Sequence, residues 1–360
     1  MKKLIIAVSF VISFYSYAKS SSPIGVFDSG IGGMTVLEKM LTIDNFDNVT
    51  FERKSDGRPD FEGESFIYFG DQANMPYGDY AAHGKSEYLK RLIVADAEFL
   101  LSKEAKSLVI ACNTATAWGL TLVRERSAKD DVETTGVIEA GVRSALTEPT
   151  AVNASGGFTI GVMATPGTIA SSAYERTVKE QTKKMGVTGK VLVFSQGCAG
   201  LADAVEAGLV DAEKIAVENF RALKAKADAA KEPLRVVILG CTHYPFVLDA
   251  LQNEAPNVKF VDPSLATAEE CYLSLKNKGL LSKNKKSSLK VFISVPRKDL
   301  DKKFLDENGS LTRECKYGRD INDKTLWTEV KPYTSVDAAK NNFISRALPA
   351  VSKMLKGENK

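Results

Sequence analysis

Histidine is scarce in this sequence, with only two residues in 360. The five cysteines do not cluster with them at zinc-type spacings, so the sequence argues against a metal site. Net charge is also low, at +3 over the whole chain. So low a net charge argues against nucleic acid or an acidic surface as a partner. The sequence therefore predicts neither a metal centre nor a nucleic-acid interface.

Apolar runs of the ~20 residues that span a bilayer are missing as well. The nearest approach is N-terminal, where Lys2 and Lys3 precede an apolar run over 4–14 and then Ser16-Tyr17-Ala18. Small residues at those cleavage positions are typical of a secretory signal peptide. The alternatives are a first strand of a cytoplasmic protein, disfavoured because a strand follows at 24–27, and a membrane anchor, for which the run is short. We expect export, to the periplasm, with cleavage after Ala18 and no membrane association afterwards.

The composition is that of a globular protein, with 44% hydrophobic and 26% charged residues. Short β-branched runs alternate with longer amphipathic ones, a pattern that predicts an α/β fold with mainly parallel sheets and helices on both faces. In such sheets ligands bind beyond the carboxyl ends of the strands. The predicted strands cover 24–27, 66–69, 108–111, 136–138, 159–163, 191–194, 236–239 and 258–261.

One predicted helix, over 86–104, carries an irregularity. Tyr88, Leu92, Ile93 and Leu100 lie on one face at helical spacing, together with Leu89 and Phe99. Asp96 interrupts this apolar face.

The chain also contains a weak internal echo. The run 109–114 resembles 237–242, since each is an apolar strand that ends in a cysteine with threonine beside it. Two lobes related by a pseudo-twofold axis would face these cysteines across a cleft. We predict a first lobe from 19–134 plus about 266–300, with an inserted surface loop at 44–64, and a second lobe from 135–265. The C-terminal extension, 301–360, ends in a predicted helix over 336–355. We interpret it as a peripheral addition to the two lobes or as an oligomer contact, such as a homodimer interface.

The first predicted strand runs into Asp28-Ser29-Gly30-Ile31-Gly32-Gly33. Glycines let backbone amides approach an anion at a helix N-terminus. The run lacks the GxGxxG order of a dinucleotide site and the lysine of a phosphate loop, so a tight turn is an equal alternative. Asp28, at the strand end, could orient an ammonium group or a neighbouring thiol.

Cys112 and Cys241 each follow an apolar strand and enter a run of hydrogen-bonding residues. Either cysteine alone could be a small buried hydrophobe. A helix N-terminus and a nearby histidine, here His243, lower the pKa of a thiol and favour a reactive role. In an oxidising compartment the default for five cysteines is disulfides with one left over, which conflicts with two free catalytic thiols.

Two opposed thiols suit the inversion of an α-carbon, which requires removing a proton from one face and returning one to the other. One sulfur acts as thiolate and the other as thiol, with the roles exchanged for the other enantiomer. The carbanionic transition state needs donors around the carboxylate, which Asn113, Thr114, Thr242 and backbone amides could supply.

Five motifs occur in a fixed order: Asp-Ser-Gly-Ile-Gly-Gly at 28–33, Pro-Tyr-Gly at 76–78, Ala-Cys-Asn-Thr-Ala at 111–115, Thr-Pro-Gly-Thr at 165–168 and Gly-Cys-Thr-His-Tyr-Pro at 240–245. Together they resemble the glutamate racemases of the aspartate/glutamate racemase superfamily, over about 24–292. The resemblance implies two α/β lobes with the active site between them, no cofactor (neither pyridoxal phosphate nor metal), an amino acid as substrate and two-cysteine catalysis.

By resemblance, Cys112 deprotonates the D-enantiomer and Cys241 the L-enantiomer. Asp28 would support Cys112, and His243 with Glu206 would support Cys241. Glu206 could equally be a solvated helix residue, Tyr77 a packed turn aromatic, and Cys198 is interpreted as structural. The implied substrate contacts are Asp28, Ser29, Tyr77, Gly78, Asn113, Thr114, Thr165, Thr168 and Thr242.

Departures from the family pattern bear on substrate and location. The family usually supplies D-glutamate for peptidoglycan in the cytosol, whereas this chain carries an apparent signal peptide. The usual Asp-Thr-Ala-Arg before Pro-Tyr-Gly is Asp71-Gln72-Ala73-Asn74 here, so an arginine is missing, and Ala140 and Ala199 stand where proline is common. A racemase for aspartate or a broader set of amino acids is one alternative. An exported amino-acid-binding protein with oxidised cysteines is another.

Overall fold

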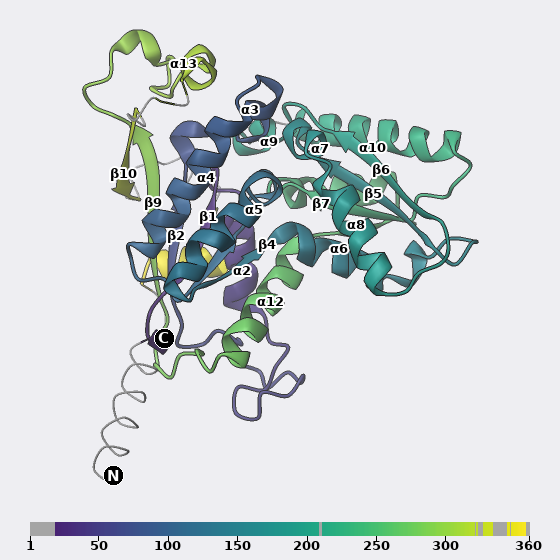
Figure 1. The fold of residues 1–360 in the computed structure, drawn as a ribbon, viewed down its shortest axis with the longest axis horizontal. Coiled ribbons are helices and arrows are strands. Elements are labelled where there is room, and N and C mark those ends of the chain that lie inside the picture. The colour runs from purple at the N-terminus through teal and green to yellow at the C-terminus, as the bar shows by residue number, and fades with distance from the viewer. Residues whose placement is uncertain are drawn as a thin grey trace.

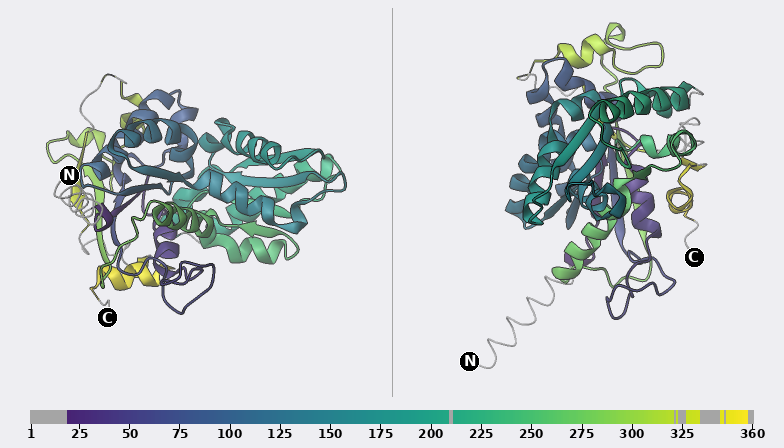
Figure 2. Two further views of the ribbon diagram at one scale, coloured as in Figure 1. Left: turned by 60° about the horizontal axis from the view of Figure 1, so that its bottom comes forward. Right: turned by 90° about the vertical axis from the view of Figure 1, so that its right-hand side faces the viewer.

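The structure is a computed structural model that describes residues 19–208, 211–320, 322, 327–333, 344, 345 and 347–357. Two lobes lie side by side, each built on one sheet (Figures 1 and 2). The predicted α/β fold with mainly parallel sheets is confirmed. The predicted signal peptide lies outside the described residues.

The first sheet has the order β10-β9-β2-β1-β3-β4. All neighbours pair in parallel except β10, which is antiparallel to β9 and comes from the region after residue 300. The extension thus supplies the edge strand of the first sheet. The strands are β1 (Ile24–Asp28), β2 (Ser65–Gly70), β3 (Ser107–Ile110), β4 (Glu133–Gly136), β9 (Ser288–Pro296) and β10 (Thr328–Pro332).

The second sheet repeats the arrangement of the first, with the order β6-β5-β7-β8 and parallel pairing throughout. In each lobe the first strand lies between the second and third, and the fourth follows. β3 and β7 therefore occupy equivalent places, which is the structural counterpart of the internal echo. The strands are β5 (Phe158–Ala164), β6 (Val191–Gly197), β7 (Val236–Gly240) and β8 (Lys259–Val261).

Helices cover both faces of the first sheet, because its strands bury alternate side chains on opposite sides. Ile24 and Val26 of β1 pack with α2, α12 and α15, whereas Phe27 packs with α4 and α5. The helices of this lobe are α2 (Met34–Thr42), α3 (Gly78–Ala82), α4 (Ser86–Leu101), α5 (Asn113–Ser127), α12 (Pro263–Asn277) and α15 (Pro349–Leu355), with 3₁₀ turns η1 (Gln72–Asn74) and η2 (Ala128–Asp130).

The second sheet is covered in the same way. Met163 and Leu239 pack with α9, α10 and α11, and Val162 and Ile238 pack with α6 and α8. The helices are α6 (Val137–Thr147), α7 (Pro166–Ala170), α8 (Ala173–Lys184), α9 (Leu201–Glu206), α10 (Asp211–Ala229) and α11 (Leu248–Glu254), with η3 (Pro149–Ala151) and η4 (Tyr244–Val247). Each lobe therefore has a hydrophobic core on either side of its sheet. The carboxyl ends of the strands remain available for the site.

The predicted elements match except at a few boundaries. The strand predicted at 136–138 is wrong: β4 ends at Gly136, and Val137 and Ile138 begin α6, where they form part of its buried face. The helix predicted over 86–104 ends at Leu101, and Glu104 takes a left-handed conformation in the turn that follows. Part of the helix predicted at 336–355 lies outside the described residues, and α15 forms its end.

The segment 44–64 runs as a loop from α2 to β2. Asp60 accepts hydrogen bonds from the backbone of Asn45 and Phe46 and holds the two ends of the loop together. Phe46 and Phe61 are buried against Tyr272 of α12. Aromatic packing therefore fixes this loop to the first lobe.

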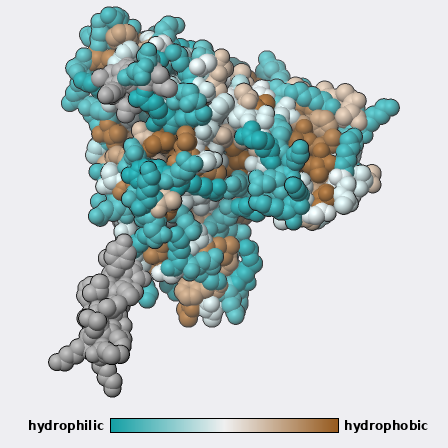
Figure 3. All heavy atoms as spheres, in the orientation of Figure 1, coloured by the Kyte–Doolittle hydropathy of each residue, from teal (hydrophilic) through white to brown (hydrophobic). Residues whose placement is uncertain are grey.

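The extension contains η5 (Lys302–Phe304) and α13 (Arg313–Gly318) before it reaches β10. Figure 1 and the right view of Figure 2 place α13 at one end of the first lobe, beyond α3. On the face seen in Figure 3, apolar residues form separate patches on both lobes among hydrophilic ones. Within the described ranges, no helix has both the length and the apolar character needed to cross a membrane.

Candidate active site

The carboxyl ends of strands from both sheets meet around one small cavity. Its volume is about 20 Å³, room for roughly one water molecule. Entry of an amino acid therefore requires the surrounding segments to separate. The lining consists of Asp28, Ser29, Met75, Pro76, Tyr77, Gly78, Cys112, Asn113, Thr114, Thr165, Ala202, Cys241, Thr242 and His243.

Cys112 follows β3 and is the N-cap of α5. Its sulfur accepts a hydrogen bond from the backbone N–H of Ala115 at 3.4 Å, and its thiol points to the hydroxyl of Ser29 at 3.8 Å. The helix N-terminus thus presents a donor to the sulfur, an arrangement that stabilises a thiolate.

The surroundings of Cys112 act in the opposite direction overall. Burial raises the pKa of the Cys112 thiol well above its ordinary value, and the nearby charges of Asp28 and Cys241 add to this. The N–H of Ala115 opposes the rise but does not offset it. The sequence predicts a lowered pKa from the helix N-terminus, whereas in the closed cavity desolvation dominates. Cys112 is therefore a thiol in this form of the protein.

Asp28 ends β1 beside Cys112. One oxygen, Oδ2, accepts from the backbone N–H of Gly33 at 2.8 Å, and the buried Oδ1 has no hydrogen-bond partner among the described residues. A buried, unpaired carboxylate oxygen calls for a donor. An ammonium group or a thiol in the cavity could supply it.

Cys241 follows β7, the equivalent of β3 in the second lobe. Its sulfur lies 3.8 Å from Nδ1 of His243, and Nε2 of the same ring lies 3.1 Å from Oε2 of Glu206. Oε1 of Glu206 accepts from Nε2 of Gln72 at 2.8 Å. Cysteine, histidine and carboxylate thus form a buried chain, which an amide from the first lobe completes.

Both partners keep His243 protonated. Burial by itself would lower the pKa of the imidazole, but hydrogen bonds to Cys241 and Glu206 and their charges outweigh it. The pKa of His243 is therefore raised well above its ordinary value. A cationic imidazole beside a sulfur stabilises its thiolate.

The two lobes touch closely at this site. A Cβ on Gly32, in the loop after β1, would lie 2.6 Å from Cε1 of His243 and 2.7 Å from the Thr242 hydroxyl. A Cβ on Gly78 would lie 2.7 Å from Thr165. Glycine is needed at both positions because the opposite lobe occupies the space of a side chain.

Polar side chains of the two lobes also bond directly to one another beside the cavity. The hydroxyls of Thr114, Thr165 and Thr168 lie 2.9 to 3.0 Å apart in a triangle. Asn113 accepts from the hydroxyl of Tyr174 at 2.6 Å, which fixes the orientation of its amide. These groups form a preorganised set of donors and acceptors along one wall.

Tyr77 lines the cavity, but its hydroxyl points away into a buried acidic cluster. It lies 2.5 Å from Oδ2 of Asp71 and 2.7 Å from Oδ2 of Asp96. Asp71 also accepts from Asn74 at 2.8 and 2.9 Å and from Ser294 at 2.5 Å. Asp96, the residue that interrupts the apolar face of α4, therefore anchors an aromatic wall of the site.

The structure brings most of the predicted site residues together. Of the predicted catalytic residues, all but Glu206 line the cavity, and Glu206 lies behind His243. Of the predicted substrate contacts, all but Thr168 line it, and Thr168 supports Thr114 and Thr165. Their roles stay predictions. Sequence reasoning missed Gln72 and the Asp71–Asp96 pair, of which only Asp96 left a signal, as a charge on an apolar helix face.

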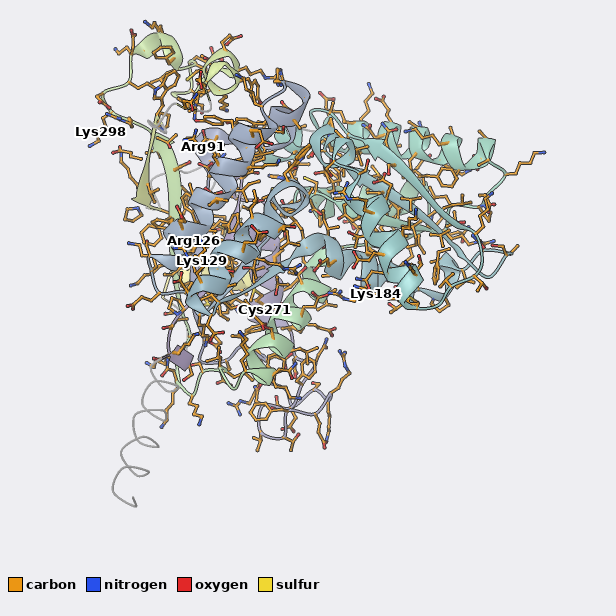
Figure 4. The ribbon with its side chains drawn as sticks, in the orientation of Figure 1. Arg91, Arg126, Lys129, Lys184, Cys271 and Lys298 are labelled. Carbon is orange, nitrogen blue, oxygen red and sulfur yellow. The ribbon has the colours of Figure 1, made fainter. Side chains whose placement is uncertain are left out.

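All five cysteines lie among the described residues, and none forms a disulfide. Cys198 is buried outside the cavity lining, with its thiol directed at the Gln196 carbonyl at 3.6 Å. Cys271 lies on α12 inside the first lobe (Figure 4). Cys315 packs in the extension against Ala73 and Leu311. Cys112 and Cys241 are thus the two that share a cavity.

Comparison with known proteins gives a consistent picture. Residues 65–271 match the family described as Asp/Glu/Hydantoin racemase. A glutamate racemase from Carboxydothermus hydrogenoformans is 32% identical over 271 residues, covering 74% of this chain and 84% of that protein. The solved structure of a glutamate racemase isoform from Bacillus anthracis is similar at 30% identity and a TM-score of 0.61, covering 76% of this chain and 88% of that one.

A second similar structure is a glutamate racemase from Francisella tularensis in complex with D-glutamate. It is 30% identical, with a TM-score of 0.57, and the match covers 76% of this chain and 88% of that one. The similarity to both solved structures extends over most of each chain.

Proposed function

Because this chain belongs to the Asp/Glu/hydantoin racemase family, we propose that it interconverts L- and D-glutamate by proton transfer at the α-carbon, with Cys112 and Cys241 as the two bases. The observation that supports this most directly is that the two sulfurs come from equivalent strands of two lobes and line the same cavity. We infer that a substrate held in this cavity has one sulfur on each side of its α-carbon.

The proposed reaction needs a proton donor on one face and an acceptor on the other. In one direction Cys112 takes the α-proton of D-glutamate and Cys241 returns a proton from the opposite face. In the other direction Cys241 takes the proton of L-glutamate and Cys112 returns one. Each turnover leaves the pair in the complementary protonation state, and the reverse reaction or exchange with solvent restores it.

The surroundings of the two sulfurs suggest how each becomes a base. The imidazole of His243, held by Glu206, lies beside Cys241 and is placed to exchange a proton with its sulfur. Cys112 instead lies near Asp28, whose charge adds to the rise in its pKa that burial causes. A substrate ammonium at the unpaired oxygen of Asp28 would neutralise that charge. Binding of the amino acid would therefore lower the pKa of Cys112 and prepare it for proton abstraction.

The substrate's carboxylates would be bound by the polar wall of the cavity. Asn113, Thr114, Thr165, Thr242 and Ser29 supply the hydroxyl and amide donors. Donors placed before the reaction stabilise the charge that develops on the α-carboxylate as the proton leaves. No cofactor takes part in this scheme.

The test is incubation of the protein with single enantiomers of glutamate in deuterated water. We expect the optical rotation of either enantiomer to fall to zero while deuterium enters at the α-carbon. Aspartate and the other common amino acids, assayed in the same way, decide the breadth of specificity. Substrate binding without deuterium exchange or inversion would instead support an amino-acid-binding protein and contradict the proposal.

Location and cell biology are part of the same proposal. We infer export through the signal sequence at 1–18, with action on amino acids of the periplasm and a contribution to D-amino acids for the cell wall. Release of a mature chain that begins at Lys19 would support export, and an intact N-terminus in the cytoplasm would contradict it. A homodimer stays a prediction that sedimentation can decide.

A further inference from the structure

The C-terminal extension reaches back onto the loop that forms one wall of the cavity. Nζ of Lys316 donates to the carbonyl of Met75 at 2.6 Å, and the hydroxyl of Tyr317 lies 3.3 Å from Oδ2 of Asp79. The ring of Tyr317 also stacks on His83 at 4.1 Å between centroids. Three residues of the wall, Pro76 to Gly78, thus lie between two attachment points of the extension.

A third contact comes from Arg319, which is only 2% exposed. Its Nη1 donates to Oδ1 of Asn74 at 2.7 Å and to the hydroxyl of Tyr88 at 3.1 Å. The guanidinium lies over the rings of Tyr88 and Trp327, at 5.7 and 5.4 Å from their centroids. Its Nε and Nη2 have no hydrogen-bond partner among the described residues.

So deeply buried a cation needs a compensating charge. Among the described residues, the carboxylate connected to it is Asp71: the charge of Arg319 is one of several influences that lower the pKa of Asp71, after the hydrogen bonds that Asp71 accepts and against the larger rise that burial causes. The two do not touch directly. The side chain of Asn74 lies between them, accepting from Arg319 and donating to Asp71.

This connection leads to the cavity. Asp71 accepts from the hydroxyl of Tyr77, and Tyr77 forms part of the cavity wall. A chain of hydrogen bonds therefore runs from Arg319 through Asn74 and Asp71 to Tyr77. Arg319 and Asn74 are 245 residues apart in the sequence. The extension thus brings a cation to residue 74, at the start of the segment that leads into the cavity wall.

We propose that Arg319 is a positioning residue of the active site, and that the extension supplies this distant cation to hold the wall formed by 75–78. Its kinetic consequence rests on the proposed racemase function. The geometric consequence, a fixed conformation of 74–82, does not.

The experiment compares the full-length protein with the variants Arg319→Ala, Arg319→Lys and Asn74→Arg/Arg319→Ala. The double variant moves the guanidinium from residue 319 to residue 74, next to Asp71, into space that the shortened side chain vacates. The control is Arg297→Ala, which removes an exposed arginine paired with Asp299 between β9 and the extension. Arg297 precedes Lys298, which lies at the outer edge of the first lobe, away from the second lobe (Figure 4).

Two readouts are needed: amide hydrogen exchange of 74–82, and kcat and KM in both directions. For Arg319→Ala we expect faster exchange confined to this segment and a loss in kcat/KM of about 10- to 100-fold, the scale of a displaced binding wall. A large part of the loss should be in KM, because the wall contacts substrate. Arg319→Lys should be intermediate, since lysine lacks the planar fork. The double variant should recover most of both readouts.

Unchanged exchange at 74–82 in a folded Arg319→Ala protein would overturn the proposal. So would exchange that rises throughout the first lobe together with activity that Asn74→Arg does not restore, since that describes a purely structural residue. If Arg319→Ala does not fold but the double variant does, the need for a guanidinium beside Asp71 is supported. A wild-type protein that racemises nothing refutes the proposed function alone, because the exchange comparison still decides the role of Arg319.

Discussion

The hydroxyl of Tyr77 lies 2.7 Å from the carboxyl group of Asp96, and both side chains are buried. The same hydroxyl lies 2.5 Å from Asp71, yet it has a single proton to donate. One of the two carboxyls must therefore carry a proton of its own. Burial raises the pKa of Asp96 well above its ordinary value, and the charge of Asp71 raises it further. We assign the proton to Asp96, which donates to Tyr77 while Tyr77 donates to Asp71.

This assignment predicts a pH-dependent stability. An unfolded aspartate loses its proton near pH 3.9, but folded Asp96 keeps it to higher pH, so the stability that Asp96 contributes falls as pH rises between the two pKa values. In Asp96→Asn, the amide replaces the donating carboxyl and does not titrate. The unfolding free energy of wild type relative to this variant should therefore fall with pH, by up to about 1.4 kcal/mol per unit.

Urea unfolding from pH 4 upward measures this difference. A matched control is Glu98→Gln, which alters an exposed carboxylate two residues away on the same helix. A difference that is flat with pH, or that rises, would show that Asp96 is ionised in the folded protein.

The two-base mechanism predicts that Cys112→Ala abolishes racemisation, with a loss of at least about 10³-fold, because one face of the α-carbon loses its base. Exchange of the α-proton of L-glutamate can persist, since Cys241 remains. Cys198→Ala is the control, because Cys198 is buried outside the cavity lining. Normal turnover by Cys112→Ala in a rotation assay is incompatible with the mechanism.

The contact between Glu206 and His243 predicts a shift in the pH–rate profile. Removal of the carboxylate charge in Glu206→Gln lowers the pKa of His243, because that charge helps to hold it up. The limb of the L-to-D profile that reports the imidazole should move to lower pH by about 1 to 3 units. Glu213→Gln, an exposed change on α10, should leave the profile in place. An unmoved limb in Glu206→Gln would remove His243 from the mechanism.

The close approach of the lobes predicts that Gly32→Ala inactivates the protein. The new methyl would overlap the ring of His243 and the hydroxyl of Thr242 and push them out of the cavity. We expect a loss of at least about tenfold in kcat/KM in both directions, with secondary structure retained. The control is Gly318→Ala, since no atom lies within 4 Å of a Cβ at that position. Full activity in Gly32→Ala would mean that the lobes are not in contact there during catalysis.

The sequence carried most of the information about where chemistry occurs. Asp28, Cys112 and Cys241 could be found because each follows an apolar strand, and parallel strands bring such positions to one edge. The alternation of elements also predicted both sheets. The prediction of a strand at 136–138 failed because two consecutive apolar residues fit the buried face of a helix as well as they fit a strand.

What the sequence could not reveal depends on contacts between distant residues. No local pattern connects Gln72 with Glu206, or Arg319 with Asn74, since these pairs form only when separate elements pack. The closed state of the cavity could not be predicted from the sequence either. Burial, which no motif encodes, reverses the expected direction of the pKa shift at Cys112.

The repeated strand order of the two sheets has a consequence for what half of the molecule could do. Each half holds a single sulfur at the end of its third strand. A polypeptide with only one half could remove a proton from one face of its substrate and return a proton only to that same face. Its product would therefore always keep the handedness of the substrate. Under the proposed two-base mechanism, inversion of the substrate therefore requires both halves, either fused or paired face to face.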